Sequence, residues 1–131
     1  MRILILFLSF LLVSSFAYAE DEEGAEPITE YLELMPKFTV NLDKPKKYLA
    51  VNVQLLLEGD EFIEKVKNNL PPLRHELIML FSGRSTVGLQ TMEQRELLRK
   101  EAKEALAKVM EKMLKGNEGL KDVFFTEFLV N

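Results

Sequence analysis

The sequence predicts an α+β fold in which a small antiparallel sheet is packed on one side by two or three helices. Apolar residues alternate with polar ones at 38–57, which is typical of strands, and a further strand pattern closes the chain at 123–130. Between residues 62 and 113 the apolar residues recur instead at steps of three and four. Strands followed by helices and a last strand, with no internal repeat, indicate helices layered on a sheet.

The first residues have the layout of a signal peptide. Met1 and Arg2 precede an apolar run at 3–16, which ends at the small-residue segment 17–19. A signal peptide over 1–19 predicts an exported chain that is periplasmic after cleavage. The alternative is an uncleaved signal anchor, which would hold the chain in the inner membrane facing the periplasm.

Residues 20–33 are predicted to form an acidic leader before one domain at 34–131. Charge repulsion and low apolar content predict disorder where five acids crowd together, namely Glu20, Asp21, Glu22, Glu23 and Glu26. The chain has no cysteine, which excludes disulfides and thiolate metal ligands. Basic residues are interspersed with acids and form no stripe, so no nucleic-acid partner is expected.

The first strands are predicted on either side of Pro36. A short strand at 28–34 is interrupted by this proline, and residues 38–42 alternate as a half-buried strand. The clearest strand spans 48–57, with Leu49, Val51, Val53, Leu55 and Leu57 on one face. Turn residues at 43–46 join the last two strands, so we expect them to pair antiparallel.

Three helices are predicted after these strands. The first two span about 61–69 and 72–81, because Pro71 and Pro72 interrupt the apolar stripe and Asp60 is placed to cap the first turn. Thr91 and Gln94 form a capping box for a third helix that ends near Lys115. Its apolar face is expected to contain Leu98, Ala102, Ala105, Leu106, Val109 and Met113.

The final strand is largely apolar on both faces. Strict alternation puts Phe124, Thr126, Phe128 and Val130 on one face and Val123, Phe125, Glu127 and Leu129 on the other. One face is expected to be core, and the other to need cover from a chain segment or a partner, but alternation does not say which. The candidate interface residues are Phe125, Glu127 and Leu129. Glu127 is interpreted either as a satisfied edge residue or as a partner-binding carboxylate.

No catalytic, cofactor-binding or metal site is predicted, and the chain is expected not to be an enzyme. His75 is the only histidine and has no cysteine to join it, whereas a zinc site needs several converging ligands. We expect it to be an exposed imidazole. The sequence has no Gly-x-Ser-x-Gly elbow and no glycine-rich phosphate loop.

Four segments in order resemble the FliL family of flagellar basal body-associated proteins. They are residues 38–42, 48–55, 72–82 and 123–130, and residues 97–101 are similar to that family's long helix. The resemblance implies a stomatin-like fold, no catalytic residues or cofactor, and a homo-oligomeric ring. It further implies that the periplasmic domain binds or encircles flagellar stator or basal-body proteins and supports motility.

The N-terminus departs from the family pattern, because it resembles a cleavable signal where members usually keep a membrane-spanning helix. A released domain would lack the effective concentration that an anchor beside the stator provides. The alternative function is a stomatin-like structural scaffold at the membrane surface that is unrelated to the flagellum.

Overall fold

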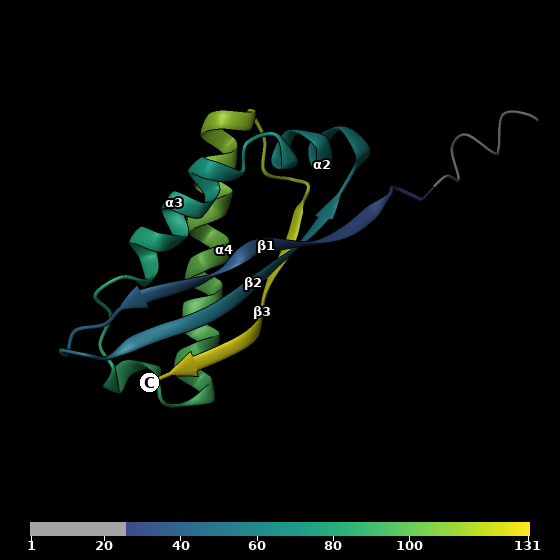
Figure 1. Cartoon of the computed structure of the whole chain (residues 1–131). Coiled ribbons are helices and arrows are strands. Elements are labelled where there is room, and N and C mark those ends of the chain that lie inside the picture. The colour runs from purple at the N-terminus through teal and green to yellow at the C-terminus, as the bar shows by residue number, and fades with distance from the viewer. Residues whose placement is uncertain (1–25) are drawn as a thin grey trace, which may run out of the picture.

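The structure, a computed structural model, describes residues 26–131, so the predicted signal peptide or anchor and most of the acidic leader lie outside the described residues. The elements are β1 (Thr29–Asn41), β2 (Tyr48–Glu58), α2 (Asp60–Lys67), α3 (Leu70–Phe81), the 3-10 turn η1 (Val87–Leu89), α4 (Met92–Leu114) and β3 (Leu120–Val130). The strands form one antiparallel sheet in the order β1-β2-β3, with α3 and α4 on one side (Figure 1). The predicted α+β class is confirmed.

The core lies between the helices and the face of the sheet that they cover. The inward residues of β2 that alternation predicted, from Leu49 to Leu57, are all fully buried. Against them pack apolar residues of the two covering helices, namely Leu73, Leu77 and Phe81 of α3 and Leu98, Ala102, Leu106, Met110 and Leu114 of α4. We call the opposite face of the sheet the outer face.

β1 is one long strand, where two strands separated by Pro36 were predicted. Leu34 pairs with Val53 and Phe38 pairs with Val51, so the register shifts between them. Leu34 and Phe38, on either side of the irregular segment, are both buried. The irregularity therefore leaves both side chains facing the helices. A proline fits such an irregularity since it cannot donate to the ladder. The sheet begins at Thr29, so the domain boundary predicted at residue 34 falls inside β1.

The helix starts differ in detail from the predicted ones. Gly59, at φ 98°, is the N-cap residue of α2, and Asp60 is the first helical residue instead of the cap. α3 begins at Leu70, so its prolines occupy the first turn, where missing N–H groups cost no helical bond.

The predicted capping box of α4 is confirmed. Gln94 N donates to Thr91 Oγ1 at 3.1 Å, and Thr91 N donates to Gln94 Oε1 at 3.0 Å. The predicted apolar face was wrong at its C-terminal end, because Met110 and Leu114 are buried while Met113 is 48% exposed. The buried residues of α4 recur every four positions from Leu98, which keeps them on the side that faces the sheet.

The two faces of β3 do not follow the predicted odd and even sorting. Asn52 pairs with Glu127 and Val53 pairs with Phe125, so Thr126 is an extra residue in β3. One extra residue reverses the alternation beyond it. The helix side therefore receives Val123 and Phe125 before the bulge, and Phe128 and Val130 after it.

Candidate partner-binding surface around the last strand

Four phenylalanine rings form a row on the helix side of the sheet. Phe38 of β1 contacts Phe81 of α3, Phe81 contacts Phe125 of β3, and Phe125 contacts Phe128, with ring centroids 5.8, 5.8 and 5.6 Å apart. We call these four residues the aromatic row. The first two contacts are edge-to-face, which is a favoured geometry for buried rings. The row therefore ties β3 to β1 through α3.

A guanidinium group lies over each end of the aromatic row. Arg74 of α3 lies 4.2 Å from the Phe38 ring centroid, and Arg95 of α4 lies 4.6 Å from that of Phe128. A cation over a ring face contributes about 0.5–2 kcal/mol, depending on desolvation. Arg95 Nε also donates to Leu89 O at 3.2 Å, which fixes the side chain beside β3.

Arg99, one turn further along α4, fastens the helix to β3. Its Nη1 donates to Asp122 Oδ1 at 2.6 Å and to Val123 O at 2.8 Å, and its other end is ion-paired with Glu96. The hydrogen bond from Arg99 lowers the pKa of Glu96, and the bond to Glu96 in turn raises the pKa of Arg99. Partial burial opposes ionisation of Asp122, but the Val123 amide and Arg99 bring its pKa below the ordinary value. All three groups are therefore charged at neutral pH.

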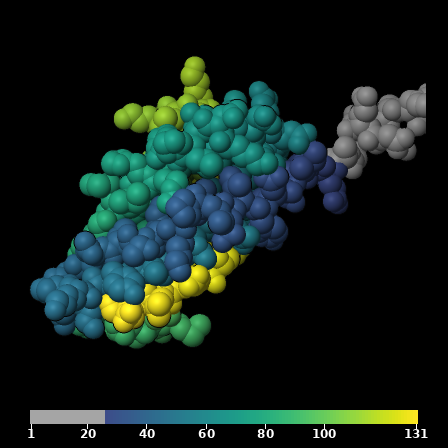
Figure 2. Space-filling model, viewed as in Figure 1, coloured from purple at the N-terminus to yellow at the C-terminus, as the bar shows by residue number. Residues whose placement is uncertain are grey.

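The outer face carries two apolar spots separated by a polar bridge. Glu127 of β3 accepts a hydrogen bond from Asn52 of β2 at 3.0 Å and lies 3.5 Å from Lys37 of β1, so the bridge spans all three strands. On one side of it Tyr31 contacts Phe124, with ring centroids 6.3 Å apart. On the other side Leu129 is 49% exposed. β1, coloured blue, and β3, coloured yellow, are both exposed at the molecular surface (Figure 2).

A groove of about 520 Å³ runs between the N-terminal half of α4 and β3. We call it the β3 groove, and its lining residues are Met92, Arg95, Glu96, Arg99, Phe124, Phe125 and Phe128. Its walls are thus aromatic and aliphatic, while its charges come from α4. Met92, at its end, is 87% exposed.

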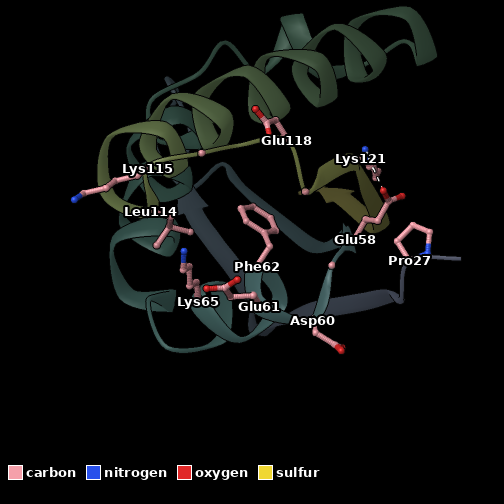
Figure 3. A pocket seen from close by; sticks show the side chains of 13 residues that line it. Pro27, Glu58, Asp60, Glu61, Phe62, Lys65, Leu114, Lys115, Glu118 and Lys121 are labelled. Atoms are coloured by element: carbon pink, nitrogen blue, oxygen red, sulfur yellow. Dashed lines mark ion pairs between the residues drawn. The ribbon is translucent and has the colours of Figure 1, made fainter. Parts of the chain in front are cut away.

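A second cavity, of about 450 Å³, lies at the far end of the molecule between α2, the end of α4 and the start of β3 (Figure 3). The Phe62 ring points into it, and Lys121 and Glu58 form an ion pair at its rim, 3.5 Å apart. The other charged residues around it are of both signs, namely Asp60, Glu61, Lys65, Lys115 and Glu118. Such a mixed lining selects neither an anion nor a cation.

The structure separates the three predicted interface residues. Phe125 lies on the helix side within the aromatic row, whereas Glu127 and Leu129 lie on the outer face. Arg95 and Arg99 were not predicted to lie beside β3. Their spacing of four residues on a helix was a signal that they share a face, but the sequence does not state which strand that face meets.

The side chains considered as catalytic or metal-binding candidates are not brought together in the described part of the chain. His75 is exposed on α3, and among residues 26–131 no three His, Asp or Glu side chains are grouped to hold a metal ion. Within the same residues, no helix combines the length and the apolar character needed to cross a membrane.

Fold and surface together define a small α+β domain whose sheet is covered by helices on one side and presents an outer face with apolar spots. Residues 31–130 match the family described as flagellar basal body-associated protein FliL, so the chain belongs to the FliL family. It is also 26% identical over 100 residues to the flagellar protein FliL of Aquifex aeolicus (strain VF5). That similarity covers 75% of this chain and 59% of the Aquifex protein, which is less than two thirds of the relative's length.

Proposed function

We propose that the chain is a non-enzymatic binding module that attaches to motor or stator components in the periplasm and supports motility. The observation that carries the proposal is the family match over nearly the whole described domain, residues 31–130. The surface chemistry agrees with binding, since exposed apolar and aromatic side chains such as Leu129 and Tyr31 border a charged bridge.

A clean deletion of the gene tests this function. Swimming speed and the number of engaged stator units should fall, most clearly under high load, and expression of the full chain should restore both. Unchanged swimming, swarming and stator occupancy at every load would contradict a role in the motor.

The outer face is the proposed contact surface, with Glu127 and Leu129 as its candidate interface residues. Leu129 supplies apolar area, and Glu127 supplies a carboxylate that Asn52 and Lys37 already orient. We expect the same face also to mediate assembly of the chain into a homo-oligomeric ring, because exposed apolar side chains rimmed by polar ones are typical of protein–protein contacts. For Phe125 we propose a different role, namely holding β3 in place, because its ring packs against Phe81 in the aromatic row.

Processing at the N-terminus decides whether the module is soluble or anchored. Cleavage after Ala19 would give a periplasmic chain that begins at Glu20. Intact-mass measurement of the periplasmic and membrane fractions tests this. A chain recovered only from membranes, with its N-terminus intact, would instead support the inner-membrane anchor.

A further inference from the structure

The outer edge of β3 is open near its C-terminal end. β3 is an edge strand, and Tyr48 and Asn131 exchange two backbone hydrogen bonds of 3.0 Å each. Bonded pairs alternate along an antiparallel ladder, so Phe128 and Val130, which pair with Val51 and Leu49, direct their N–H and C=O groups away from β2. Unpaired groups of this kind are a template for a further strand.

Two other stretches of the sheet edges are occupied or interrupted. At Val123 the backbone N–H donates to Asp122 Oδ1 and the carbonyl accepts from Arg99, both at 2.8 Å. On β1 the irregularity after Leu34 interrupts the edge, and Asn41 O accepts from Gly83 N at 2.8 Å. No such contact is found along the part of β3 beside Arg95 and Phe128 among residues 26–131.

The groove next to this edge selects the side chain of an added strand. A residue directly opposite Phe128 in a new ladder would place its side chain on the same face as the Phe128 ring. Arg95 lies over that ring and forms no ion pair with a carboxylate of residues 26–131, whereas Arg99 is paired with both Glu96 and Asp122. A carboxylate is the side chain that fits there.

We propose that an extended segment of a partner protein adds to the sheet along Phe128 and Val130 and places one Asp or Glu against Arg95. Backbone hydrogen bonds would provide affinity, and the carboxylate with an apolar neighbour over Met92 would provide selectivity. The inference rests on the proposed function, since it states how a binding module holds its partner. It concerns the β3 edge and is separate from the outer-face contact.

Two synthetic peptides test the proposal on the purified full chain. Each has nine residues that alternate threonine and valine, with a central glutamate in one and a central lysine in the other, on the valine-bearing face. Fluorescence anisotropy should show saturable binding of the glutamate peptide at concentrations up to about 1 mM, and binding of the lysine peptide should be weaker by roughly tenfold or more.

Charge reversal on the protein provides the matched comparison. Arg95→Glu should invert the preference, so that the lysine peptide binds more tightly than the glutamate peptide. Lys108→Glu makes the same charge change at an exposed position of α4 that does not line the groove, and should leave the preference unchanged.

A proline substitution separates backbone pairing from side-chain contact. Val130→Pro removes an N–H that points away from β2, so it takes no bond from the ladder with β2. Val130→Pro should weaken binding of the glutamate peptide severalfold more than Val130→Ala does. Val130→Ala is the control because it removes only the side chain.

The proposal is overturned by lack of saturable binding, by equal affinity for the two peptides, or by an Arg95→Glu variant with unchanged preference. None of these results would change the motility phenotype of a gene deletion, so the proposed function would still stand. Peptide binding together with a deletion that does not affect swimming would instead retain the edge site and remove the motor role.

Discussion

Gly119 is buried just before β3, between the Phe62 ring and the backbone of Glu58. A Cβ there would stand 2.2 Å from Phe62 Cδ1 and 2.7 Å from Glu58 O. The ring can rotate away, but the Glu58 backbone is held because its N–H donates to Gly119 O at 2.8 Å. We expect Gly119→Ala to lower the free energy of unfolding by about 1–3 kcal/mol, measured by urea denaturation.

Gly116→Ala is the control for this substitution, since no heavy atom lies within 4 Å of a Cβ at that position. It should change the free energy of unfolding by no more than about 0.5 kcal/mol. Equal losses in the two variants would show that close packing at Gly119 is not the cause.

Asp43 links the turn after β1 to the loop after α3 and makes stability depend on pH. The N–H and hydroxyl of Thr86 both donate to its carboxylate at 2.8 Å and hold its pKa below the ordinary value of 3.8. A carboxyl group with a lowered folded pKa stabilises the fold above its unfolded pKa, and this stabilisation is lost as pH falls through the folded pKa.

Asp43→Asn should therefore be less stable than the unmodified chain at pH 7, and the difference should shrink as pH falls below about 3.8. Urea denaturation at a series of pH values measures that difference. Glu33→Gln, at an exposed position, serves as the control. A difference that stays constant down to pH 2 would assign the effect of Asp43→Asn to shape and not to charge.

At the scale of the element, the bulge at Thr126 decides which β3 side chains stabilise the domain. Phe125 contacts Phe81 and Phe128, so Phe125→Ala should lower the free energy of unfolding by roughly 2 kcal/mol, less than for a fully buried ring. Leu129→Ala, on the outer face, should change it by no more than about 0.5 kcal/mol. Thermal melts of the two variants compare them directly.

An Ala series along β3 extends this test to the register. Losses should be large at Val123, Phe125 and Phe128 and small at Glu127 and Leu129, because the bulge shifts the inward face by one residue. A strict odd and even pattern of losses would contradict the bulge.

At the scale of the whole molecule, the outer face is expected to mediate self-association. Tyr31→Glu combined with Leu129→Glu places a charge in each apolar spot without touching the core, since the two side chains are 60% and 49% exposed. The sedimentation coefficient of the double variant should fall to that of a monomer, while its thermal melt stays within a few degrees. Unchanged assembly would exclude this face as the oligomer contact.

The sequence alone determined the parts of the fold that depend on local periodicity. β2 could be predicted because Leu49 to Leu57 alternate on a strand with one covered face, and α4 because Thr91 and Gln94 form a local cap before a helical repeat. The FliL family was also identified from ordered segments of sequence, and the family match confirms it. The same kind of periodicity was the basis for choosing the candidate interface residues, namely Phe125, Glu127 and Leu129.

Only the tertiary structure decided where the alternation breaks and which elements meet. Pro36 lies within β1 and Thr126 forms a bulge in β3 because the register of each edge strand is set by its pairing with β2, which no local pattern encodes. The bulge separates Phe125 from Glu127 and Leu129. The approach of Arg95 and Arg99 to β3 likewise follows from packing between segments far apart in the chain, so the groove beside Phe128 is a property of the folded molecule.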